Sequence, residues 1–126
     1  MIEISHLTKR FAGTAAVNDI SFRVEQGEIL GFLGPNGAGK TTTMRILASF
    51  SAPTEGNVTI GGYNVVTQSL AVRKLLGYLP ENVPLYPEMR INEYLQFRAK
   101  LKGVPRRERT GRINQVLDQC GLPDVR

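Results

Sequence analysis

The sequence predicts an α/β fold, and three observations support this prediction. Apolar and polar residues alternate over residues 2–5 and 20–25, as in strands of an antiparallel layer with one wet face. A short apolar run at 28–33 precedes a glycine cluster and is typical of a strand buried on both faces in a parallel sheet. Residues 40–49 then carry apolar side chains at helical spacing. The predicted order is antiparallel layer, buried strand, glycine loop, helix.

The rest of the chain predicts further short elements. Val58 and Ile60 indicate a strand that ends at a glycine pair, and residues 70–76 indicate a helix. Residues 76–79 are expected to be extended until Pro80, and they are the one plausible parallel neighbour of the 28–33 strand.

Two helices are expected near the C-terminus. The first has an apolar stripe from Ile91 to Leu101 and stops at Gly103. The second has Pro105 in its first turn and Gly121 as its C-cap.

Charge is unevenly distributed along the 126 residues, whose net charge is +5. Residues 1–87 carry seven Lys/Arg and six Asp/Glu, whereas residues 88–126 carry nine and five. Such a basic region is compatible with nucleic acid, with an anionic membrane surface, or simply with solvated helix faces. No aromatic residue interleaves with the basic run after Phe97, which argues against base stacking, and no nucleic-acid partner is expected.

The single cysteine, Cys120, excludes an intrachain disulfide and suits a reducing cytosol. The N-terminus lacks the apolar stretch of a signal peptide, and no apolar run approaches the length of a membrane span. We therefore expect any membrane association to come through a partner.

The glycine cluster fits the pattern G-x-x-x-x-G-K-S/T, a phosphate-binding loop. Its eight positions are Gly34, Pro35, Asn36, Gly37, Ala38, Gly39, Lys40 and Thr41, and Thr42 follows them. Because the glycines lack Cβ atoms, consecutive backbone N–H groups can point into one hollow and meet a phosphate. The helix that begins near Lys40 adds its positive dipole end.

Each polar side chain of this pattern has a predicted task. Lys40 brings a positive charge to the β- and γ-phosphates of a bound nucleotide. The Thr41 hydroxyl is a hard oxygen ligand for Mg²⁺, and Thr42 can reach the α-phosphate. ATP and Mg²⁺ are the cofactors that follow.

The loop reads GPNGAGKTT, the form that it takes in ABC ATPases, and the flanks resemble that family over nearly the whole chain. The resemblance covers LTKRFAGTAAVNDISFRVEQGEILGFLGPNGAGKTT (7–42) and GYLPENVPLYPEMRINEYLQF (77–97). It implies a P-loop NTPase core with an antiparallel β layer at 1–87 and the beginning of a truncated helical subdomain at 88–126.

The resemblance also implies roles for three residues outside the loop. Phe11, near the end of the first strand, would stack on adenine, which a ring face suits; the alternative is a core phenylalanine. Val17 would back the purine or the ribose. Glu81 stands where many members carry the glutamine of the Q-loop; subunits related to multidrug and gliding-motility exporters often have Glu there. A carboxylate at that position would approach Mg²⁺ and the γ-phosphate as a catalytic and metal-binding group, the alternative being a turn residue after Pro80.

The family's partners follow from the same resemblance. We expect a transmembrane permease subunit, a second ATP-binding subunit, and a peripheral, cytoplasmic position at the inner face of the cell membrane. The family's Asp-Glu strand end, LSGGQ-type signature and switch histidine do not occur before Arg126. We therefore expect a fragment or truncated product that binds ATP without hydrolysing it. A non-catalytic ATP-binding fragment and another P-loop enzyme, such as a nucleotide kinase, are the alternatives.

Overall fold

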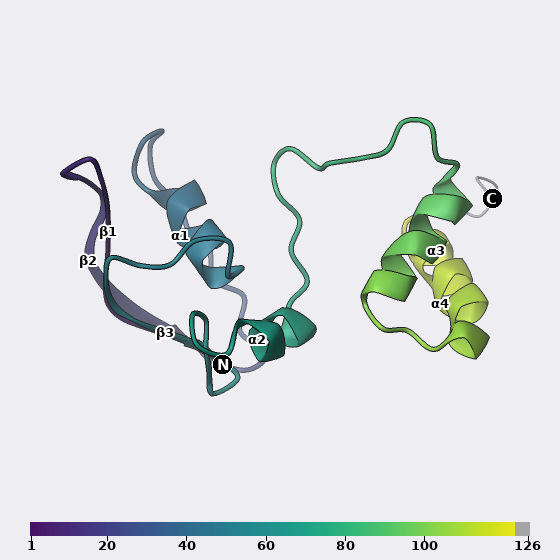
Figure 1. The fold of residues 1–126 in the computed structure, drawn as a ribbon, viewed down its shortest axis with the longest axis horizontal. Helices are drawn as coiled ribbons and strands as arrows, with labels where there is room; N and C mark the ends of the chain where they lie inside the picture. Colours follow the sequence, from purple (N-terminus) through teal and green to yellow (C-terminus); the bar gives the residue numbers. More distant parts are fainter. Residues whose placement is uncertain (123–126) are drawn as a thin grey trace. The chain divides into compact units, whose positions relative to one another are not determined.

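The computed structural model describes residues 1–122 and contains two compact units (Figure 1). The first unit is Met1–Tyr78 and the second begins at Leu79. The sequence-based boundary, between residues 87 and 88, falls inside the second unit. The two units are described separately below.

An antiparallel sheet of four strands forms the first unit (Figure 1). The strands are β1 (Ile2–Phe11), β2 (Thr14–Val24), β3 (Glu55–Ile60) and β4 (Tyr63–Asn64), in the order β2-β1-β3-β4. The antiparallel layer expected from the alternation at 2–5 and 20–25 is therefore confirmed, and the strand expected at Val58 and Ile60 is β3.

The alternation in β1 is interrupted by a bulge that the sequence pattern did not reveal. His6 in β1 and Asp19 in β2 have φ of 51° and 48°, and the register between the strands shifts between Ile4 and Leu7. One extra residue turns Leu7 to the same face as Ile4, so that both are buried. On the outside, His6 Nδ1 lies 2.8 Å from Asp19 Oδ1, and the His6 N–H donates to Ser21 Oγ.

Helices α1 (Lys40–Leu47) and α2 (Ser69–Leu75) contribute to one apolar core with the sheet. Every helix start predicted from the sequence in this unit lies within one residue of the observed start. The core residues come from strands, helices and the segment after β4: Ile4, Leu7, Val17, Ile46, Val58, Ile60, Val65 and Val72. This core holds the N-terminal end of α1 against β2.

The buried parallel strand predicted at 28–33 is not formed, and this part of the fold prediction was wrong. Ile29 is 99% exposed and Leu33 is 92% exposed, although the Phe32 ring packs against Phe22 with centroids 5.5 Å apart. A strand requires a neighbour that accepts and donates its backbone hydrogen bonds. Within residues 1–122 no strand pairs with this segment, and the neighbour expected at 76–79 forms no ladder either, although Leu76 is extended.

The second unit contains a helical hairpin of α3 (Ile91–Leu101) and α4 (Arg106–Gln119). The two expected C-terminal helices are thus confirmed; Pro105 is the residue before α4, and Gly121 follows its C-cap, Cys120. Ile113 and Leu117 are buried. None of the helices in residues 1–122 is long and apolar enough to cross a membrane.

Replacing Ile29 and Ile46 separately by alanine tests the unpaired 28–33 segment. Ile29→Ala should change the free energy of unfolding by less than about 0.5 kcal/mol, because the side chain is almost fully exposed. Ile46→Ala should cost about 2–5 kcal/mol, because Ile46 is fully buried. Urea unfolding of the 126-residue chain measures both, and comparable costs for the two variants would show that the segment is buried as a strand.

Candidate functional site

The phosphate-binding pattern forms a tight loop that leads directly into α1. Gly37 and Gly39 have φ of 83° and 84°, a conformation that other residues adopt only with strain. The N–H of Ala38 donates to the Pro35 carbonyl over 3.2 Å and closes a turn inside the loop. Two of the three loop glycines therefore stand where the backbone needs glycine, whereas Gly34 does not adopt a positive φ.

Gly39 fixes the loop against the sheet. A Cβ atom at this position would clash with the carbonyl oxygen of Ala16 and would lie 2.9 Å from Val17 Cγ2. Val17 is itself a core residue and is 5% exposed. The absence of a side chain at Gly39 thus lets the start of α1 rest directly on the backbone of β2.

The first turn of α1 presents unsatisfied backbone donors. The cap residue of α1 is Gly39, and its carbonyl accepts a hydrogen bond from the Thr43 N–H at 2.9 Å. The N–H groups of Lys40, Thr41 and Thr42 have no acceptor within the helix, as at any helix start. The cap residue is a glycine without a capping side chain, and the first turn contains no acidic residue. This helix end is therefore polarised positively and open to an anion.

Lys40 lies across the loop and ties its two ends together. Its Nζ donates to the carbonyl oxygens of Gly34 and Pro35, at 2.5 and 2.7 Å. An ammonium group has three donors, so one remains for a further acceptor. The charge is thereby held within the loop that leads into this helix end.

The three consecutive threonines at the start of α1 have different surroundings. Thr41 is exposed and Thr42 is half-buried. Thr43 is buried, and its hydroxyl donates to the Gly39 carbonyl at 3.0 Å. Thr41 and Thr42, the two positions chosen from the motif, are thus less buried than Thr43. Sequence reasoning missed Thr43, which adds a side-chain bond at the loop's junction with the helix.

The three site residues predicted outside the loop are placed differently. Phe11 ends β1, is 54% exposed, and has Lys9 Nζ 5.1 Å from its ring centroid. Val17 lies beneath Gly39 in the core. Glu81 is exposed and belongs to the second unit, whereas the loop belongs to the first. The roles of these residues stay predictions.

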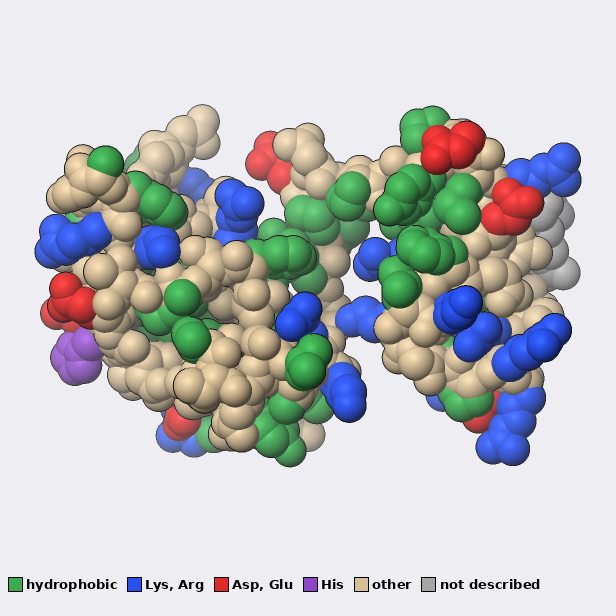
Figure 2. Space-filling model, viewed as in Figure 1, with side chains coloured by type: hydrophobic (Ala, Val, Ile, Leu, Met, Phe, Trp, Pro, Cys, Tyr) green, Lys and Arg blue, Asp and Glu red, His purple; other side chains and the backbone are tan. Residues whose placement is uncertain are grey.

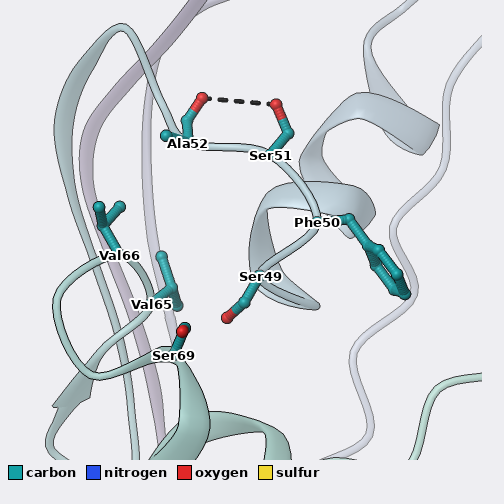
Figure 3. A pocket seen from close by; sticks show the side chains of 7 residues that line it. All are labelled: Ser49, Phe50, Ser51, Ala52, Val65, Val66 and Ser69. Atoms are coloured by element: carbon teal, nitrogen blue, oxygen red, sulfur yellow. Dashed lines mark hydrogen bonds between the residues drawn. The ribbon is translucent and has the colours of Figure 1, made fainter.

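A separate small pocket lies beyond the other end of α1 (Figure 3). Its volume is about 170 Å³, and its lining residues are Ser49, Phe50, Ser51, Ala52, Val65, Val66 and Ser69. Ser49 has φ of 59°, and its buried hydroxyl has no hydrogen-bond partner. The lining contains no charged side chain that would neutralise a phosphate, which distinguishes this pocket from the glycine loop.

Among residues 1–122, no group of three or more His, Cys, Asp or Glu side chains is arranged to hold a metal ion. The exposed Thr41 hydroxyl is one oxygen donor beside the loop, and a bound phosphate would supply others.

Comparisons with known proteins found a family model and relatives that match most of the chain. The family model described as ABC transporter matches residues 17–126. The linearmycin resistance ATP-binding protein LnrL of Bacillus subtilis (strain 168) is 33% identical over 124 residues, which cover 98% of this chain and 40% of that protein.

Two solved structures share the fold. One, described as the ATP binding subunit of an ABC transporter, matches with a TM-score of 0.86 and 29% identity over 97% of this chain and 51% of that one. The other, a dimeric post-hydrolysis state of the ATP-binding cassette MJ0796 bound to ADP and Pi, has a TM-score of 0.78, 22% identity, and coverage of 94% and 56%. The chain thus spans about half the length of these two proteins.

Replacing Gly37 and Gly39 separately by alanine should distinguish the cost of backbone strain from the cost of steric overlap with β2. Gly37→Ala should cost about 1–2 kcal/mol, because its φ is positive but its Cβ would enter open space. Gly39→Ala carries the same strain plus overlap with Ala16 and Val17, which adds about 1–3 kcal/mol. Urea unfolding of both variants measures the difference; equal costs would mean that Gly39 does not rest on β2.

Proposed function

The chain belongs to the ABC transporter family, and on that premise we propose that its glycine loop binds the phosphates of ATP. One observation supports this most directly: the Lys40 ammonium and the uncapped N–H groups of α1 converge at the same loop. Both are donors, one carries a full positive charge, and no acidic residue in the first turn opposes them. A triphosphate supplies the complementary acceptors and negative charge.

In this proposal different residues of the loop bind different phosphate groups of ATP. The N–H groups at the start of α1 donate to phosphate oxygens, and Lys40 exchanges its bonds to the carbonyls of Gly34 and Pro35 for bonds to the β- and γ-phosphates. The exchange is favourable because a charged acceptor makes a stronger hydrogen bond than a neutral carbonyl. Thr42 donates to the α-phosphate.

A magnesium ion fits the donors that are available. The Thr41 hydroxyl is exposed beside the loop and is a hard oxygen ligand. When bound, the ion would neutralise charge between the β- and γ-phosphates. Glu81 is proposed as a second protein ligand near the ion, because it occupies the position of the Q-loop glutamine in the sequence.

For the base of the nucleotide we propose Phe11 and Val17. Phe11 presents an exposed ring at the end of β1, which suits the π face of adenine. Val17 packs beside Gly39 and is almost fully buried, so any contact of Val17 with the purine or the ribose would be made by its small exposed part at the edge of the core.

The complete protein is proposed to couple ATP to transport across a membrane. The solved relatives are described as an ATP binding subunit of an ABC transporter and as a dimeric cassette with ADP and Pi. By analogy, this chain would act with a second ATP-binding subunit and a transmembrane permease, at the cytoplasmic face of the membrane. ATP hydrolysis would belong to that assembly.

Lys40→Ala should weaken ATP binding by about ten- to a hundredfold. The estimate follows from the loss of one charge-assisted hydrogen bond of about 1.5–3 kcal/mol. Isothermal titration calorimetry with Mg-ATP measures the effect. Lys74→Ala is the matched control, because it removes the same side chain from the exposed part of α2. Unchanged affinity in folded Lys40→Ala protein would refute the phosphate-binding role of the loop.

The 126-residue chain should release no phosphate from ATP above background at any concentration. Its residues include no Asp-Glu pair after a buried strand to position water, and a second copy supplies nothing more. A steady-state phosphate assay checks this, with Lys40→Ala as the blank. Turnover by the unmodified chain that Lys40→Ala abolishes would show that the missing groups are present in another form.

A further inference from the structure

The positive charge of the protein is concentrated in one short segment. Residues 98–112, here called the basic turn, contain seven Lys/Arg and one Asp/Glu. The remainder of the chain contains nine Lys/Arg and ten Asp/Glu and is therefore nearly neutral. The net charge of +5 thus arises entirely from the end of α3, the start of α4 and the turn between them.

The backbone of the basic turn is held by hydrogen bonds. The N–H groups of Gly103 and Val104 donate to the carbonyls of Lys100 and Ala99, both at 3.0 Å, which ends α3 in a Schellman motif. Arg109 Nε donates to the Val104 carbonyl at 2.8 Å and ties α4 to the turn. These hydrogen bonds fix the backbone that carries the charged side chains.

Most of these basic side chains are exposed, and residues 98–112 contain only one acidic residue to oppose them. Lys100, Arg106, Arg107 and Arg112 are exposed, and Figure 2 shows Lys and Arg side chains gathered on the unit that contains α3 and α4. The one acidic residue, Glu108, lies 3.7 Å from Arg107 Nε. Because Arg107 is 87% exposed, water and salt weaken this pair and the local field stays positive.

The basic turn also contains an exposed apolar side chain, Leu101. Leu101 is 64% exposed between Lys100 and Lys102. Attraction of basic residues to anionic lipid adds to the burial of an apolar group at the headgroup boundary, so this combination suits an anionic membrane surface. The nearby aromatics are engaged elsewhere: Phe97 packs edge-on against Tyr86, at 5.9 Å between centroids, and Arg98 lies over Tyr94. The surface therefore offers charge and one aliphatic group, but no free ring for stacking on bases.

We propose that the basic turn binds directly to the anionic phospholipid surface of a membrane. The Lys and Arg side chains meet the headgroup phosphates, and Leu101 inserts at the level of the acyl boundary. This contact is independent of the nucleotide site and is additional to any attachment through a permease.

Vesicle binding of the 126-residue chain tests the proposal. Flotation with phosphatidylcholine vesicles, with and without phosphatidylserine, should show binding only when the anionic lipid is present, and binding should weaken as salt is raised. The variant Lys100→Gln/Arg106→Gln/Arg107→Gln should lower the partition coefficient about a hundredfold, from about fivefold for each basic residue.

A second triple variant controls for total charge. Arg10→Gln/Arg45→Gln/Lys74→Gln removes the same charge from exposed positions of the first unit and should leave binding within about twofold. Leu101→Ser should lower binding about tenfold without changing the net charge. Far-UV circular dichroism establishes that each variant is folded.

Three outcomes would overturn the proposal. Equal losses in the two triple variants would show that net charge alone drives adsorption. Absence of binding to phosphatidylserine vesicles at low salt would exclude a lipid contact. Tighter binding to a DNA duplex than to the vesicles, lost in the first triple variant and unaffected by Leu101→Ser, would identify a nucleic-acid surface instead.

Discussion

The contact between Gly39 and β2 is the constraint on which the candidate site depends. The helix that supplies the N–H donors can approach the Ala16–Val17 backbone only because Gly39 has no side chain. Val17 belongs to the core formed by β1, β2, β3 and the helices, so the position of the loop is fixed by the packing of that core. A helix end carries its dipole whatever its surroundings, but it binds an anion selectively only when its position and the neighbouring charge are fixed together.

The loop is therefore held in place by the helix that follows it, α1. The segment before it, residues 28–33, is exposed and unpaired, whereas α1 after it packs through Ile46 and Gly39. Lys40 completes the arrangement, because its bonds to Gly34 and Pro35 tie the start of the loop to the helix. In this structure the loop is therefore held without a strand at 28–33, and the exposed Ile29 and Leu33 leave apolar surface open to a partner or to association.

The two compact units differ in their electrostatics. The first concentrates positive potential at one point, where a single lysine and a helix end converge. The second spreads six net positive charges over a turn of fifteen residues. A focused site suits a compact polyanion, and a spread field suits an extended anionic surface, because long-range attraction adds over many weak contacts. The same kind of residue thus serves different purposes according to the backbone that displays it.

The sequence by itself determined the local features: the alternation of β1 and β2, the helices, and the loop with Lys40 and Thr41 at the start of α1. Each of these depends on residues close together in the chain, so spacing and glycine positions suffice to predict it. The tertiary structure decided the bulge at His6, the packing of Gly39 on β2, and the failure of 28–33 to pair. It also placed Glu81 in a different unit from the loop. These features depend on contacts between residues distant in the chain, and a strand in particular is defined by a hydrogen-bonding neighbour that its own sequence does not contain.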